Sequence, residues 1–304
     1  MARILIIKLG ALGDLVQSFA PFAAIRRHHP GAHLALLTTR PFVALCEASP
    51  WFDEVLVDDR PPWWRLNRVL ALRRMLRGYD FVYDLQTSGR SSRYFRLAGR
   101  PGWSGIARGA SHPHDNCARN SMHTRERQAD QLARAGIAEV PWPDLGWLAG
   151  HGRSLPEPYA LLVPGAAPHR PAKRWPVGRY AALASALAAR GLRPVVVGAA
   201  GDAPLAAAIR SACPTALDLT GQTGLSELGG VASRARVAIG NDTGPMHLAA
   251  AMGTRCVVLF SAESDPALTA PRGPDPERVV VLRRDDLADL QVEDVLARVA
   301  AFPG

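Results

Sequence analysis

The chain has 304 residues, of which 48% are hydrophobic, a composition that excludes a disordered protein and allows large buried cores. No apolar run approaches the roughly 18–20 residues of a membrane-spanning helix, and we interpret the apolar start, residues 3–8, as a core strand rather than a signal peptide. The net charge of +9 favours anionic partners such as nucleic acid, an anionic membrane or phosphorylated substrates.

The four cysteines lie far apart in the sequence and lack the spacing of metal ligands. They are therefore expected to be reduced, structural thiols of a cytoplasmic protein. The basic residues form no recognisable nucleic-acid-binding module, so no nucleic-acid partner is expected. These cysteines are Cys46, Cys117, Cys213 and Cys256.

The first half of the chain alternates two kinds of pattern. Short apolar, β-branched runs predict strands over residues 3–8, 33–38, 54–57, 81–84 and 103–106. Apolar residues at helical spacing predict helices over 14–28, 41–47, 66–76, 91–98 and, after a loop at 108–120, over 124–135. This alternation is typical of a parallel sheet with helices on both faces.

A stretch rich in Pro, Gly and Trp at 140–158 predicts a linker between two domains, 1–150 and 151–304. Alternation then restarts, with strands predicted over 159–163, 194–197, 217–219, 236–239, 256–260 and 279–282, and helices over 177–190, 204–212, 225–233, 245–252 and 292–301. The sequence leaves open that the terminal helix packs back on the first domain. The predicted fold class is α/β, with two doubly wound, Rossmann-like domains. Ligands of such sheets bind beyond the carboxyl ends of the strands, so the two domains are expected to face an interdomain cleft.

The first loop after a strand, Lys8-Leu-Gly-Ala-Leu-Gly-Asp14, is Gly-rich. It matches neither the dinucleotide fingerprint nor the phosphate P-loop. Gly13 lets the backbone approach a substrate closely. Asp14 begins the next helix, where it acts either as a helix cap or as a general base, and the spacing alone favours neither.

Two further loops carry polar groups after strands. In residues 164–176, Lys173 and Arg174 either place a cation over a pyrophosphate or belong to a solvated basic loop. Glu227 lies near a helix start, where capping is the commoner role and a hydrogen bond to a ribose is the alternative.

The stretch 237–253 predicts a buried strand, a Gly-containing turn and a helix that starts at Pro245 and stops at Gly253. A helix N-terminus after a buried strand is a site for an anion such as phosphate. Asp242 or Thr243 is expected to cap the helix. No Asp-x-Asp occurs in the chain, so a lysine and a helix N-terminus would have to neutralise a leaving diphosphate.

Taken together, these stretches resemble glycosyltransferase family 9, the lipopolysaccharide heptosyltransferases. The matching segments follow the family's order over nearly the whole chain and comprise residues 3–8 with 13–14, 164–166 with 172–176, 218–223 and 241–253. The resemblance implies a GT-B fold, an ADP-heptose donor and inversion at the anomeric carbon. It also implies that the enzyme needs neither a cofactor nor a metal.

The resemblance also implies roles for individual residues. Asp14 matches the proposed base that deprotonates the acceptor hydroxyl, and Lys173 matches the lysine on the donor phosphates. Asp242 matches the carboxylate that holds the heptose hydroxyls. The remaining donor contacts implied are Thr243 and Gly244 on the diphosphate, His247 in the same turn, and Met246 and Glu227 near the nucleotide. From the sequence alone, His247 is equally compatible with a core histidine.

A basic, aromatic segment at 60–108 suits an anionic, lipid-linked acceptor. The acceptor side is expected to include Gly13, Arg65 and Arg68. The implied enzyme is cytoplasmic, with peripheral contact at the inner membrane face, and transfers heptose to the lipopolysaccharide inner core.

Two segments depart from the family pattern and bear on the donor rather than on the fold. Residues 261–266 replace a Gly-Pro-containing turn, and Ala167, Pro168 and His169 stand where small hydroxyl residues are usual. The alternatives are a related transferase with another nucleotide sugar or a protein acceptor, and a nucleotide-sugar-binding protein without turnover.

Overall fold

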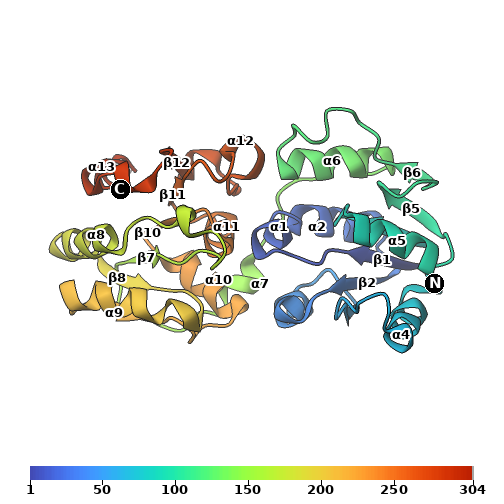
Figure 1. Ribbon diagram of the computed structural model, residues 1–304, viewed down its shortest axis with the longest axis horizontal. Coiled ribbons are helices and arrows are strands. Elements are labelled where there is room, and N and C mark those ends of the chain that lie inside the picture. The colour runs from blue at the N-terminus through green and yellow to red at the C-terminus, as the bar shows by residue number, and fades with distance from the viewer. Residues whose placement is uncertain (303–304) are drawn as a thin grey trace. The chain divides into compact units, whose positions relative to one another are not determined.

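The computed structural model describes residues 1–302 and consists of two compact units, Met1–Pro143 and Asp144–Gly304 (Figure 1). The division lies before the boundary expected after residue 150. The reason is a short helix, α7 (Gly146–Ala149), which packs on α10 (Leu225–Arg234) of the second unit. Its Leu148 is fully buried there, so the end of the expected linker belongs to the second unit's core.

The first unit contains a six-stranded parallel sheet. Its strands are β1 (Arg3–Ile7), β2 (His33–Thr38), β3 (Glu54–Val57), β4 (Phe81–Asp84), β5 (Gly102–Gly105) and β6 (His112–Pro113). Their order is β3-β2-β1-β4-β5-β6. The short β6 lies in a segment expected to be a loop, and it forms because its two residues pair with Ser104 and Gly105 at the sheet edge.

The helices of the first unit follow the predicted pattern with one break. They are α1 (Leu12–Val16), α2 (Phe19–His28), α3 (Val43–Glu47), α4 (Leu66–Leu76), α5 (Gly89–Leu97) and α6 (Thr124–Arg134). The helix expected over 14–28 is divided at Ser18. Pro21 cannot follow a continuous helix, because its ring would meet the carbonyl of Gln17. At this break the Ser18 hydroxyl donates to the Asp14 carbonyl at 2.8 Å.

The second unit repeats this architecture with β7 (Tyr159–Val163), β8 (Arg193–Val196), β9 (Leu217–Asp218), β10 (Val237–Asn241), β11 (Cys256–Phe260) and β12 (Val279–Arg283). The strands are parallel and ordered β12-β11-β10-β7-β8-β9. The remaining helices are α8 (Val177–Ala189), α9 (Ala203–Ala212), α11 (Gly244–Ala251), α12 (Pro266–Thr269) and α13 (Val292–Ala301). Short 3₁₀ turns are η1 (Arg40–Phe42), η2 (Pro171–Lys173), η3 (Ala200–Asp202), η4 (Pro276–Arg278) and η5 (Leu287–Asp289).

The terminal helix α13 packs on α8. Its Val292 and Val295 join the apolar core of the second unit, so they complete that core, although the sequence had left open a packing on the first domain. None of the helices within residues 1–302 has the length and apolar character required to cross a bilayer.

The two sheets share a feature that positions functional loops. In each sheet the strand order reverses between two central neighbours, β1 and β4 in the first unit and β7 and β10 in the second. The loops that leave the carboxyl ends of these strands diverge there, and doubly wound proteins bind ligands at this point. The predicted functional loops after residues 7, 163 and 241 all begin at these positions.

Candidate active site

Asn241, the last residue of β10, is a polar side chain with no exposure. Its Oδ1 accepts hydrogen bonds from the Trp175 amide at 3.0 Å and the Tyr180 hydroxyl at 3.1 Å. Its Nδ2 donates to the carbonyls of Pro164 and Gly165 at 2.8 and 3.2 Å. Asn241 therefore fixes both ends of the loop 164–176. This role of Asn241 was not predicted, and the one signal for it in the sequence is an amide residue at the end of an apolar strand.

The fixed loop brings Lys173 to Asp242. The Lys173 ammonium lies 2.5 Å from Asp242 Oδ2, and the two side chains are 13% and 6% exposed. Lys173 ends η2, and Asp242 follows Asn241 directly. The structure thus joins two residues that the sequence placed in separate loops, and it does not leave Lys173 on a solvated basic loop.

Two more groups surround the Asp242 carboxylate. The Ser264 hydroxyl donates to Oδ2 at 2.7 Å, and His247 Nε2 lies 3.8 Å from Oδ1. Burial acts to raise the pKa of Asp242, but the favourable interactions of the carboxylate with His247, Lys173 and Ser264 outweigh it and lower the pKa to about 2. His247 is 6% exposed, so it is buried and also faces the site. Ser264, which the sequence analysis did not assign to the site, comes from the segment that departs from the family pattern.

The start of α11 is uncapped by side chains, contrary to the expectation for Asp242 and Thr243. Thr243 is the residue that precedes the helix, but its hydroxyl donates to the Asn241 carbonyl at 3.2 Å. Asp242 is engaged by Lys173 instead. Pro245 has no N–H, and the amides of Met246 and His247 donate to the Thr243 carbonyl, so the first turn keeps the Gly244 amide and a positive dipole end that suit an anion.

Met246 and Glu227 are expected near the nucleotide, and the side chains of both contact other parts of the second unit. Met246 has no exposure and packs beneath Gly240, where an added Cβ would lie 2.7 Å from its sulfur. Its side chain is therefore part of the core, and a position of Met246 near the nucleotide stays a prediction. Glu227 lies in the first turn of α10 and forms an ion pair with Arg153, whose hydrogen bond lowers the pKa of that carboxyl.

In the first unit, the loops after β1 and β4 are tied together. Lys8 is 4% exposed and donates from Nζ to the Leu85 carbonyl at 3.1 Å. The Leu9 amide donates to Gln86 Oε1 at 2.8 Å. Asp84 Oδ1 accepts from the amides of Gln86 and of the residue after it, and full burial raises the pKa of Asp84 to about 6. These contacts form a rigid floor beneath the Gly-rich loop.

Asp14 lies above this floor, in the first turn of α1, with Gly13 directly before it. The residue that precedes α1 is Ala11 and the helix has no side-chain cap, so the helix-cap interpretation of Asp14 is wrong. The Asp14 side chain is half-buried. Its charge interacts favourably with the buried ammonium of Lys8, although burial still lowers the pKa of Lys8.

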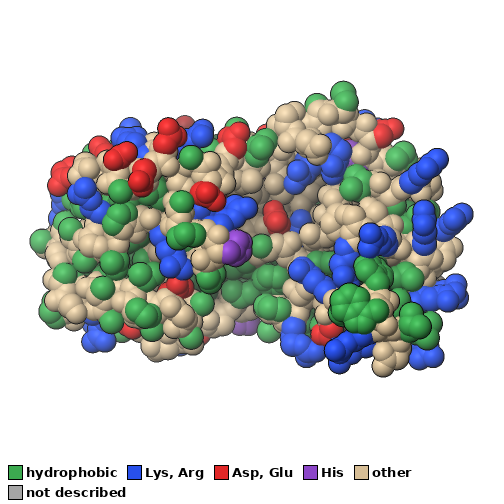
Figure 2. Space-filling view, viewed as in Figure 1, with side chains coloured by type: hydrophobic (Ala, Val, Ile, Leu, Met, Phe, Trp, Pro, Cys, Tyr) green, Lys and Arg blue, Asp and Glu red, His purple; other side chains and the backbone are tan. Residues whose placement is uncertain are grey.

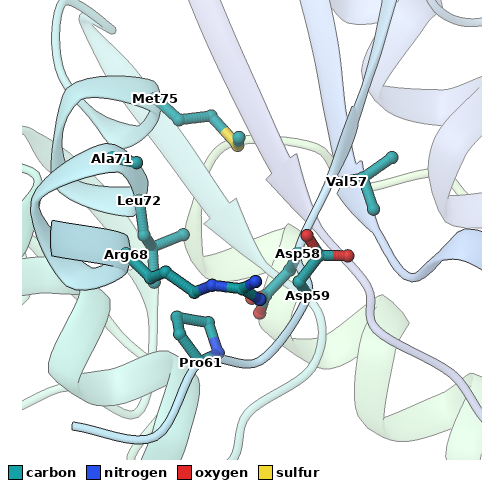
Figure 3. Close-up of a pocket in the computed structure, with 8 residues that line it drawn as sticks. All are labelled: Val57, Asp58, Asp59, Pro61, Arg68, Ala71, Leu72 and Met75. Carbon is teal, nitrogen blue, oxygen red and sulfur yellow. The ribbon is translucent and has the colours of Figure 1, made fainter. Parts of the chain in front are cut away.

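The two predicted acceptor-side arginines lie at the start of α4. Arg65 immediately precedes the helix and is exposed. Arg68 lines a hollow of about 170 Å³ beside the carboxyl end of β3, and Figure 3 shows its guanidinium directed toward Asp58 and Asp59. The apolar wall of this hollow comes from Val57, Pro61, Ala71, Leu72 and Met75. Arg68 is therefore exposed at the rim of a hollow that also contains acidic groups of its own unit.

Comparisons with known proteins agree with this architecture. Residues 121–299 match the model of a family described as glycosyltransferase family 9 (heptosyltransferase). A lipooligosaccharide heptosyltransferase 2 from Haemophilus ducreyi is 24% identical over 323 residues, which cover 93% of this chain and 89% of that protein.

Solved structures extend the likeness to the fold of the whole chain. The ADP-heptose lps heptosyltransferase II of E. coli superposes with a TM-score of 0.80 at 22% identity, over 98% of each chain. The E. coli heptosyltransferase WaaC, solved with ADP, superposes with a TM-score of 0.81 at 20% identity, over 98% of this chain and 99% of that one. The two six-stranded parallel sheets thus form the GT-B fold that the sequence predicted.

Proposed function

Since the chain belongs to glycosyltransferase family 9 (heptosyltransferase), we propose that it transfers heptose from ADP-heptose to an anionic, lipid-linked acceptor of the lipopolysaccharide inner core, with inversion. The observation that carries this proposal is the cluster of Lys173, Asp242 and Ser264 beside the open N-terminus of α11. It offers a fixed carboxylate for sugar hydroxyls next to a cationic site for a diphosphate. The E. coli relative described as acting with ADP-heptose supports the donor.

In this proposal the second unit binds the donor. The Asp242 carboxylate is held in place by its neighbours and accepts hydrogen bonds from hydroxyls of the heptose. The amides at Thr243 and Gly244 contact the diphosphate together with Lys173. An ammonium has three donors, so Lys173 can keep Asp242 and also bind a phosphate oxygen. His247 lines the same turn. Glu227, which forms an ion pair with Arg153, lies near the nucleotide.

The first unit supplies the acceptor side, with Asp14 as base and Gly13, Arg65 and Arg68 around the acceptor. The acceptor oxygen attacks the anomeric carbon opposite the diphosphate, a carbon–oxygen bond forms, and the bond to the β-phosphate breaks with its electron pair leaving on ADP. Asp14 takes the acceptor proton. Lys173 and the α11 dipole stabilise the departing charge without a metal.

The proposal places the reaction in the cytoplasm, at the inner membrane face. The proposal places the four free cysteines, three of which are buried, in a reducing compartment. Peripheral contact with the membrane follows from the lipid-linked acceptor.

Calorimetry with ADP, UDP and GDP, followed by a transfer assay with ADP-heptose and heptose-deficient lipopolysaccharide, tests the function. We expect ADP to bind at least tenfold more tightly than UDP or GDP, and ADP release to depend on the acceptor. A UDP preference would overturn the donor, whereas ADP-heptose binding without turnover in any acceptor would favour the non-catalytic alternative.

One observation favours a related transferase with a different sugar. The segment that departs from the family pattern, 261–266, contributes Ser264 directly to the carboxylate proposed to hold the sugar. A panel of ADP-sugars in the same assay separates the two candidates. Heptose is expected to give the highest kcat/KM, and a higher value with a hexose would identify the second function.

A further inference from the structure

One face of the first unit combines exposed apolar side chains with unpaired arginines. Apart from Met1, the large hydrophobic side chains that are exposed within residues 1–302 are Trp64 at 79%, Leu66 at 71% and Leu70 at 48%. Trp64 lies just before α4, and Leu66 and Leu70 lie in the first half of the helix. Figure 2 shows hydrophobic side chains gathered there with Lys and Arg side chains around them. An exposed apolar group of this kind marks an interaction surface.

The exposed side of α4 changes character along its length. Leu66 and Leu70 are followed on the same helical face by Arg73, Arg74 and Arg77, at spacings of three and four residues. Leu72 and Leu76 lie on the opposite face and are buried in the core. The helix therefore presents an apolar end and a basic end to the outside, while its inner face is fully used for packing.

The basic end of α4 continues onto α5, which packs beside it. A Cβ added at Gly99 would lie 3.9 Å from a guanidinium nitrogen of Arg77, which brings the end of α4 next to the turn after α5. Beside that turn, Phe95 and three exposed arginines line a hollow of about 320 Å³. These arginines are Arg96, Arg100 and Arg108. None of the three has an acidic partner within residues 1–302.

Acidic residues are nearly absent from this part of the chain. Between Asp59 and Asp115 the sequence holds eleven arginines and only two acids, Asp80 and Asp84. Asp84 is fully buried, and the Asp80 carboxylate accepts a hydrogen bond from the Arg3 amide. A solvated helix surface normally mixes both signs of charge, so this excess indicates a polyanionic partner.

We infer that this face, with Trp64, Leu66 and Leu70 inserted and the arginines of α4 and α5 on the headgroups, docks on a bilayer of anionic phospholipid. The inference rests on the proposed function for its purpose, since it places the first unit beside a lipid-linked acceptor. Burial among acyl chains is favourable for aliphatic side chains such as Leu66 and Leu70, whereas such side chains do not stack on nucleobases. This favours a membrane over RNA. The neighbouring Trp63 is not part of the inserted group, because Arg90 and Arg93 lie over its ring at 4.9 and 5.4 Å.

Sedimentation with vesicles tests this surface. The full chain is mixed with vesicles of phosphatidylcholine alone or with phosphatidylglycerol added. We expect binding only to the anionic vesicles, and a loss of roughly tenfold or more in partition coefficient for the double variant Arg73→Glu and Arg74→Glu. The matched control is Arg190→Glu with Arg210→Glu, two exposed arginines of the second unit that give the same net charge. Equal losses in both variants would overturn the inference.

Insertion is tested by quenching of tryptophan fluorescence with brominated acyl chains. Quenching is expected in the parent protein and is expected to fall in Trp64→Phe, whose thermal melt reports retained folding. Unchanged quenching in Trp64→Phe would overturn insertion at this face. RNA homopolymer that displaces the protein from vesicles, or binds it more tightly, would overturn the choice of a membrane.

The outcomes separate this inference from the proposed function. Heptose transfer to a delipidated, soluble acceptor is expected to be the same in the parent and in the arginine variants. Transfer without vesicle binding would overturn the docking inference and leave the proposed function intact. Vesicle binding that depends on Arg73 and Arg74, without transfer to any acceptor, would support the docking inference and overturn the proposed function.

Discussion

Asp14 and Asp242 each follow a central strand at the point where the strand order of their sheet reverses, and their side chains differ in burial and in hydrogen bonding. Asp242 is buried and is held by Lys173 and Ser264, whereas Asp14 is half-buried in the first turn of a short helix. A group that orients a sugar has to be fixed in advance, but a base has to accept a proton and release it again. Sheets with the same strand order therefore support one rigid carboxylate and one accessible carboxylate.

The floors beneath these carboxylates differ as well. Asn241 is neutral and uses both ends of its amide to fix the donor loop. Beneath Asp14, the buried groups are charged, with Lys8 next to the loop of Asp84. Burial raises the pKa of Asp84 and lowers that of Lys8, so the floor of the first unit is sensitive to pH and that of the second is not.

The largest effect is expected from Asp14→Asn, which removes the accessible base. Transfer is expected to fall by about 10²–10⁴-fold, because no other group takes the proton, while the Kd for ADP changes less than twofold. Single-turnover kinetics and calorimetry measure the two quantities. A parallel loss of ADP affinity would show that Asp14 belongs to the donor site and would break the comparison.

Lys173→Met removes one partner of the buried pair and leaves Asp242 to its other neighbours. The cost to stability is expected to be about 3 kcal/mol, as for other broken buried ion pairs, and ADP affinity is expected to fall roughly tenfold or more. Urea denaturation and calorimetry test this. Lys173→Arg is the control, since it keeps the charge, and stability unchanged in Lys173→Met would mean that the pair contributes little.

The pH dependence of stability distinguishes the two units by sign. The pKa of Asp84 is about 6 when folded, above its usual value, so the folded state holds its proton longer and stability is lost as pH rises from about 4 to about 6. The loss is on the order of 3 kcal/mol. The pKa of Asp242 is about 2, so its contribution is present above about pH 4 and is lost as pH falls toward 2.

Urea midpoints at pH 4, 5, 6 and 7 test these signs. The variant Asp84→Asn is expected to flatten the slope between pH 4 and 6, and Asp242→Asn to leave it unchanged. The reverse pattern would contradict the assignment of a pH-sensitive floor to the first unit.

The smallest effect is expected from Ser264→Ala, which removes one hydrogen bond to the fixed carboxylate. Affinity for ADP-heptose is expected to fall by about fivefold, which corresponds to about 1 kcal/mol, with ADP affinity unchanged. Ser211→Ala on α9 is the control, because that hydroxyl donates only to a backbone carbonyl of its own helix. Equal losses for ADP and ADP-heptose would remove Ser264 from the sugar side of the site.

Local sequence patterns predicted most of the architecture. The strand β7 and the helix α13 have the predicted bounds, because uninterrupted apolar periodicity over a whole element depends only on neighbouring residues. These patterns gave wrong predictions where a single residue interrupted a helix or where pairing at the edge of a sheet created a strand. Pro21 divided a predicted helix, and β6 exists only because a neighbouring strand was available for pairing.

By itself, the sequence determined the two α/β units and placed Asp14, Lys173 and Asp242 in loops after strands. Only the tertiary structure decided which side chains meet, because contacts between loops depend on their conformations and not on periodicity. It paired Lys173 with Asp242, brought in Ser264, buried Met246, and separated the packed Trp63 from the exposed Trp64.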